Sequence, residues 1–123
     1  MKLELLPMTF SVCRLADGSA ADLTAPFTFF ARTDQEVSLV CESARAPRDA
    51  LATEHGWRCL RVSGPLDFSL IGILAGIAQC LADAGVSIFA VSTFDTDYIL
   101  VKNESLSAAV AALRDRGYEI AEV

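Results

Sequence analysis

The chain has a single histidine, His55, and no two cysteines at the short spacing that zinc ligand sets use. Its four cysteines are Cys13, Cys41, Cys59 and Cys80. They are far apart and lie in apolar stretches, which favours buried free thiols in a reducing cytoplasm over disulfides. The sequence therefore predicts no metal site and no cofactor.

Basic residues are scarce, since ten Lys and Arg face sixteen Asp and Glu, for a formal net charge of −6. This argues against a nucleic-acid partner, because binding to phosphates depends on clustered Lys and Arg. The longest apolar run, Leu70–Cys80, is shorter than the ~20 residues that cross a bilayer. Met1–Glu4 lacks the basic-then-apolar form of a signal peptide. We expect a cytoplasmic protein without a membrane partner.

What the chain does have is a core, since 53% of its 123 residues are hydrophobic. Alternation over Arg58–Ser63 predicts a strand that ends in a turn. Asp67 or Ser69 is expected to cap a helix that runs to about Ala84, because the apolar residues that follow have a 3.6-residue period. Gly72 and Gly76 lie four apart on this helix. They indicate either close helix packing or the wall of a small-ligand pocket.

Two strands and a second helix follow. The β-branched and aromatic runs Val86–Ser92 and Thr96–Lys102 predict strands joined by a polar turn. Asn103 is expected to cap the second helix, and Tyr118–Val123 is the last strand. The order is βαββαβ. Because both βαβ crossovers are right-handed, both helices cover one face of an antiparallel sheet and leave the other face open for a partner. This is the ferredoxin-like α+β arrangement.

The first half of the sequence resembles a degenerate repeat of the second half. Thr33–Val40 matches Thr93–Val101 when one inserted residue is allowed, because a Thr opens each turn and Leu-Val ends each following strand. The period is near 60 residues, which indicates a duplicated unit. We expect two side-by-side repeats, a degenerate one at residues 1–56 and a clear one at 57–123. Neither unit of ~60 residues buries much core alone.

Elsewhere in the first half the pattern is weaker. Leu5–Arg14 predicts a strand and Pro47–Glu54 a short helix. His55 follows in a stretch that reads as a loop, where a solvated surface histidine is the ordinary interpretation. Because the chain has no G-x-S-x-G, H-E-x-x-H or P-loop motif, we expect no catalytic residues and no enzyme activity.

Polar groups instead gather at strand and helix ends. They are Asp67, Ser69, Ser87, Ser92, Thr93, Asp95 and Asp97. Asp67 can be an ordinary helix cap and Asp95 a turn former. Asp97 is harder to explain in this way, because it begins a strand otherwise rich in Tyr, Ile, Leu and Val. Free N–H groups at a helix start bind a carboxylate and a nearby Asp binds an ammonium or guanidinium group, so the set suits a zwitterionic amino acid.

Several segments of the second half together resemble the ACT domain superfamily. The segments are Gly64–Phe68, Gly72–Gly76, Gly85–Phe89 and Ser92–Lys102. Within it, the chain resembles small bacterial tandem-ACT proteins, which are similar to the ACT repeats of the eukaryotic arginine sensor of the mTOR pathway. The resemblance covers residues 57–122 and, more loosely, 5–42. It implies a non-catalytic regulatory module that binds amino acids at interfaces between ACT units, often as a homodimer.

In that family the ligand lies near the loop between the first strand and the first helix, and against the second strand of a neighbouring unit. By resemblance, the ligand-binding residues are Leu66, Asp67, Phe68, Ser69, Gly72, Gly85, Val86, Ser87, Ile88, Thr93, Asp95 and Asp97. The leading interpretation is therefore an amino-acid-binding sensor module. The alternative is a ligand-independent assembly module whose open sheet face pairs with an unknown protein.

Overall fold

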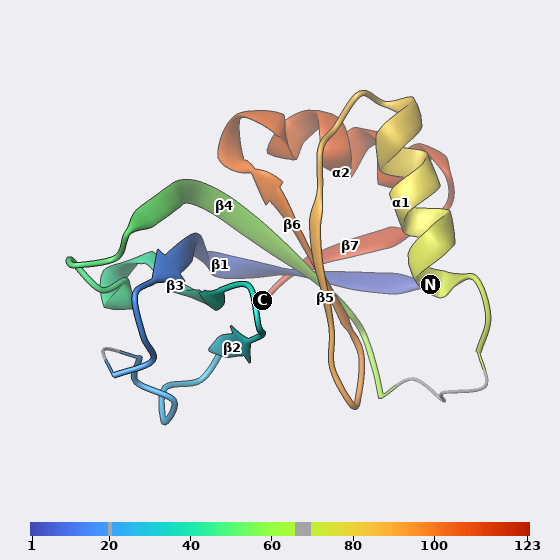
Figure 1. Ribbon diagram of the computed structural model, residues 1–123. Coiled ribbons are helices and arrows are strands. Elements are labelled where there is room, and N and C mark those ends of the chain that lie inside the picture. The colour runs from blue at the N-terminus through green and yellow to red at the C-terminus, as the bar shows by residue number, and fades with distance from the viewer. Residues whose placement is uncertain (20, 66–69) are drawn as a thin grey trace. The chain divides into compact units, whose positions relative to one another are not determined.

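The computed structural model describes three stretches of the chain, residues 1–19, 21–65 and 70–123 (Figure 1). The chain divides into two compact units. Unit 1 comprises Met1–Pro7 and Arg58–Val123, and unit 2 comprises Met8–Trp57. The first seven residues thus group with the second half of the chain, whereas the division into repeats at 1–56 and 57–123 stays a prediction.

Unit 1 contains the βαββαβ order that the sequence predicts. Its elements after the N-terminal strand are the end of β4 (Ala52–Val62), α1 (Ile73–Asp83), β5 (Phe89–Ser92), β6 (Asp97–Lys102), the 3₁₀ turn η2 (Asn103–Ser105), α2 (Leu106–Asp115) and β7 (Glu119–Glu122). The strand order is β7-β1-β4-β6-β5. The first residues of β1 (Lys2–Leu15) pair in parallel with β7. The expected all-antiparallel sheet is therefore wrong at this edge.

The first helix begins later than the sequence pattern suggests. Gly72 precedes it in the left-handed conformation, with φ +80°, which glycine adopts without steric cost. The expected caps Asp67 and Ser69 lie outside the described residues. Gly85 follows the helix with φ +75°, which confirms the predicted left-handed position after its last turn.

Both helices pack on the same side of the unit 1 sheet (Figure 1). The core formed by these helices and the sheet includes the fully buried side chains of Leu3, Leu60, Val62, Ile77, Leu81, Ile99, Val101 and Leu113. Gly76 belongs to this packing, because a Cβ there would come within 3.1 Å of the Tyr118 hydroxyl. The prediction that the opposite face is open is only partly right. Cys59 and Leu100 are fully buried, although Leu100 alternates with the helix-facing Ile99.

All four cysteines are free and buried, as the sequence predicts. Burial raises the pKa of Cys59 to about 12 and that of Cys41 to about 11. Since the thiolate is the reactive species, these side chains act as small apolar core residues in the folded protein.

Unit 2 has no α-helix within the residues that the structure describes. It consists of the rest of β1, β2 (Phe29–Arg32), β3 (Val37–Glu42), the 3₁₀ turn η1 (Ser43–Arg45) and the start of β4, in the order β2-β3-β1-β4. The short helix expected at Pro47–Glu54 is wrong, because residues from Ala52 onward belong to β4. His55 also lies in this strand rather than in a loop. It remains exposed, and its Nδ1 lies 2.9 Å from the Ser11 hydroxyl.

The two hairpins of the chain keep the same register. β2 and β5, β3 and β6, and η1 and η2 each begin 60 residues apart. The turns Thr33–Glu36 and Thr93–Thr96 have equal length, and in each the Thr N–H donates to the last carbonyl at 2.9 Å. The inserted residue assumed from the sequence is therefore wrong, and the counterpart of Asp97 is Val37. A duplicated origin remains a prediction that this register supports.

Thr96 links the β5–β6 hairpin to the end of β4 by a side-chain hydrogen bond. Its side chain is buried, and its hydroxyl donates to the Val62 carbonyl at 2.6 Å. We predict that Thr96→Val lowers the free energy of unfolding by about 1–3 kcal/mol, because the buried carbonyl loses its partner. Chemical denaturation measures this loss. Thr96→Ser retains the hydroxyl and is the control, so equal stability of the two variants would contradict the assignment.

Candidate functional site

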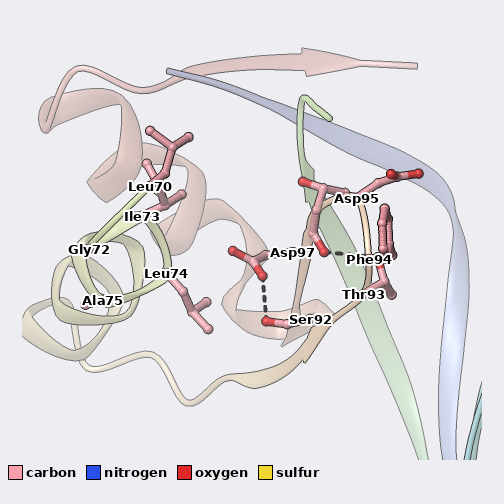
Figure 2. Close-up of a pocket in the computed structure, with 11 residues that line it drawn as sticks. Leu70, Gly72, Ile73, Leu74, Ala75, Ser92, Thr93, Phe94, Asp95 and Asp97 are labelled. Atoms are coloured by element: carbon pink, nitrogen blue, oxygen red, sulfur yellow. Dashed lines mark hydrogen bonds between the residues drawn. The ribbon is translucent and has the colours of Figure 1, made fainter. Parts of the chain in front are cut away.

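A pocket of about 280 Å³ lies between the start of α1 and the β5–β6 hairpin (Figure 2). It is lined by Leu70, Gly72, Ile73, Leu74, Ala75, Ser92, Thr93, Phe94, Asp95, Thr96 and Asp97. The helix side contributes apolar side chains and the hairpin side contributes hydroxyls and carboxylates. Because pockets for drug-sized molecules occupy roughly 300–1,000 Å³, this volume suits a small metabolite.

Four of the residues predicted from the sequence line this pocket, namely Gly72, Thr93, Asp95 and Asp97. Leu66, Asp67, Phe68 and Ser69 lie outside the described residues. The remaining four, Gly85, Val86, Ser87 and Ile88, are on the segment between α1 and β5 and are not part of its lining. Val86 is buried and Ile88 packs against the unit 1 core, whereas Ser87 is exposed.

Sequence reasoning missed most of the helix side. Leu70 and Leu74 were assigned to the apolar face of a helix by their period, which does not distinguish a core contact from a pocket wall. No pattern singled out Ile73, or Phe94, which is 79% exposed beside the pocket. Ser92 was noted as a polar group at a strand end, but only its pairing across the hairpin places it in the site.

Asp97 is the acid that faces α1. It lies half-buried at the start of β6, directly opposite Ser92 of β5. The Ser92 hydroxyl donates to Asp97 Oδ1 at 2.5 Å, and Figure 2 shows the carboxylate directed toward the first turn of α1. A negative group is thus held at one wall of the pocket.

Thr93 and Asp95 are placed differently. The Thr93 hydroxyl donates to the Thr96 carbonyl at 3.1 Å, and Thr33 is placed in the same way in the first turn. This hydroxyl therefore serves the turn. Asp95 is exposed, and its carboxylate points away from α1 in Figure 2. Of the three hairpin residues predicted from the sequence, only Asp97 presents its functional group to the helix.

The start of α1 supplies backbone donors at the opposite wall. Gly76 makes the first helical hydrogen bond, from its N–H to the Gly72 carbonyl at 2.9 Å. The N–H groups of Ile73, Leu74 and Ala75 precede it and have no partner within the helix. No side chain among the described residues caps this end. The helix dipole places partial positive charge here, which favours a carboxylate.

A second cavity of about 370 Å³ lies at the other side of the same hairpin turn. It is lined by Glu4, Arg61, Gly64, Pro65, Asp95, Thr96 and Tyr98. The Arg61 Nε lies 3.0 Å from Glu4 Oε1, and this carboxylate is the main cause of the raised pKa of Arg61. The positive charge of this cavity is therefore paired within the protein.

The described residues contain no group of three or more His, Cys, Asp or Glu side chains that could hold a metal ion. Within the same residues, no helix combines the length and the hydrophobicity needed to span a membrane.

These features define an α+β domain with a small pocket between its first helix and its central hairpin. A family model described as ACT domain matches residues 52–115. The cytosolic arginine sensor for mTORC1 subunit 1 of Rattus norvegicus is 33% identical over 108 residues, which cover 82% of this chain and 33% of the relative. The chain belongs to the ACT domain family. It spans about a third of the length of the curated relatives that it matches.

Solved structures share the fold of this chain. A crystal structure of a protein from Agrobacterium tumefaciens is 33% identical and superposes with a TM-score of 0.87, covering 99% of this chain and 92% of that one. An aspartate kinase from Clostridium acetobutylicum, described as an allosteric enzyme, shares the fold at 14% identity and a TM-score of 0.65. That match covers 88% of this chain and 32% of the kinase.

Proposed function

We propose that unit 1 binds a free amino acid and acts as a non-catalytic regulatory module. The observation that carries this proposal is the pocket itself, where the first turn of α1, which no side chain of the described residues caps, lies opposite the Asp97 carboxylate. An amino acid carries a carboxylate for the first wall and an ammonium group for the second. Family membership and a relative named as an arginine sensor support the proposal.

Among amino acids, L-arginine is the first candidate. Its ammonium or guanidinium group pairs with the carboxylate of Asp97. Leu70, Ile73 and Leu74 line the pocket and contact the aliphatic part of its side chain. The net charge of −6 also favours a cationic ligand over an anionic one.

The resemblance to ACT proteins extends the site beyond one unit. On this proposal a second copy of the chain forms a homodimer with the first and contributes its Gly85–Ile88 segment to the ligand. The Leu66–Ser69 segment, which joins β4 to α1 in sequence, contributes from the first copy. Thr93 then acts by closing the turn, and the Asp95 carboxylate makes no direct contact with the ligand.

A screen of the twenty amino acids by thermal shift tests the proposal. A ligand at about 100 times its dissociation constant adds about 2.7 kcal/mol to the free energy of unfolding, because it binds only the folded state. We predict a clear rise in melting temperature with L-arginine and no rise with L-glutamate. If none of the twenty amino acids raises the melting temperature at millimolar concentration, the protein is not an amino-acid sensor.

The alternative function is assembly with another protein without a ligand. It is favoured by one observation, the exposure of two large apolar side chains: Phe94 (79%), which lines the pocket, and Ile71 (94%), which lies between the lining residues Leu70 and Gly72 in the sequence. Large apolar side chains that gather on a surface mark interaction sites. A partner that binds equally well with and without L-arginine would support this alternative over the sensor.

A further inference from the structure

The Ser92–Asp97 pair is not a requirement of the hairpin that carries it. In the first hairpin the same cross-strand position is filled by Arg32 and Val37, which pair in the same register. That hairpin has a turn of equal length and closes with the same 2.9 Å bond. The second hairpin therefore has a hydroxyl paired with a carboxylate that the hairpin fold itself does not need. This pair lies at the position where the second hairpin faces α1.

Within the described part of the chain, this pair occupies one oxygen of Asp97 and leaves the other for a ligand. The Ser92 hydroxyl donates to Oδ1, and Figure 2 shows the second oxygen on the side of α1. A carboxylate that is held by a hydrogen bond loses less rotational freedom when it binds a cation. Hydrogen bonds that include a charged group are also stronger than neutral ones.

We infer that Ser92 is a positioning residue, which fixes the Asp97 carboxylate in the orientation that receives the positive group of the ligand. This inference rests on the proposed function and adds to it the residue that sets the strength of the site. Ser92 ends β5 and its side chain is exposed, so a substituted side chain has room there. Substitutions at Ser92 can therefore change ligand binding without preventing folding.

The test is a set of variants titrated with L-arginine by calorimetry. Ser92→Ala and Ser92→Val are expected to weaken binding about ten-fold, because both remove the hydroxyl. Ser92→Thr retains the hydroxyl and is expected to bind within about three-fold of wild type. Since Val and Thr have the same shape, their difference reports the hydrogen bond alone. In an Asp97→Asn background, Ser92→Ala is expected to cost less than two-fold, because the two residues act as one unit.

A measurement without ligand separates this inference from the proposed function. NMR couplings that report the χ1 angle of Asp97 are expected to show one rotamer in wild type and Ser92→Thr, and averaging in Ser92→Ala. Averaged couplings in wild type would overturn the inference whether or not an amino acid binds. Equal L-arginine affinity of Ser92→Ala and wild type would also overturn it. If wild type binds no amino acid, the proposed function fails, and the couplings still decide whether Ser92 fixes Asp97.

Discussion

Replacing Asp97 by Asn is expected to weaken L-arginine binding by about 10- to 150-fold, the loss of one charge-assisted hydrogen bond of ~1.5–3 kcal/mol. The change keeps the shape of the side chain and removes the negative charge that faces α1. Folding should be retained, because the first hairpin forms with Val37 at the same position. Calorimetric titration gives the affinity, and thermal unfolding without ligand checks the fold.

Asp95→Asn is the matched control for this variant. It removes the same charge two residues away, from an exposed carboxylate that points away from α1. Because this carboxylate is solvated and exposed charges interact only weakly in water, the affinity of Asp95→Asn for L-arginine should stay within about three-fold of wild type. Equal losses in the two variants would show that net charge, rather than the position of Asp97, controls binding.

Replacing Leu81 by Ala is expected to lower the free energy of unfolding by about 2–5 kcal/mol. Leu81 lies in α1 with no exposed surface, in the core that the two helices and the sheet of unit 1 share. Its removal loses apolar contact area and leaves a cavity. Because domains are stable by only ~5–15 kcal/mol, this is a large share of the total. Urea denaturation followed by circular dichroism measures the change.

Leu23→Ala removes the same atoms from a side chain that is 62% exposed. Its effect should stay within about 0.5 kcal/mol, as for most surface substitutions. If the two leucine variants were equally stable, the assignment of Leu81 to the core of the unit would be wrong.

The elements of unit 1 could be predicted because each rests on a local pattern. The period of α1, the β-branched runs of β5 and β6, and Gly85 after the helix all depend on neighbours in the chain. The position of β1 in the sheet could not be predicted. Its first residues pair with β7 at the far end of the sequence, and no local pattern specifies such a partner. The start of α1 was misplaced because the conformation of Gly72 is not visible in hydrophobic periodicity.

The site was predictable to a similar extent. Asp97 was identified because an acid is disfavoured at the start of an apolar strand. Its partner Ser92 was not assigned to the site, because cross-strand pairing depends on the register of the hairpin. The alignment of the two halves from sequence assumed one inserted residue, so it did not match Asp97 with Val37. In the correct register, Val37 of the first hairpin and Asp97 of the second occupy the same position, and the second hairpin has its carboxylate there.

The most direct test of the central claim is an NMR titration of the ¹⁵N-labelled protein with L-arginine. If the amino acid binds between α1 and the β5–β6 hairpin, the largest shift changes will fall on the backbone amides of Gly72–Ala75 and Ser92–Asp97. Saturable changes confined to other parts of the chain, with these amides unmoved, would contradict it.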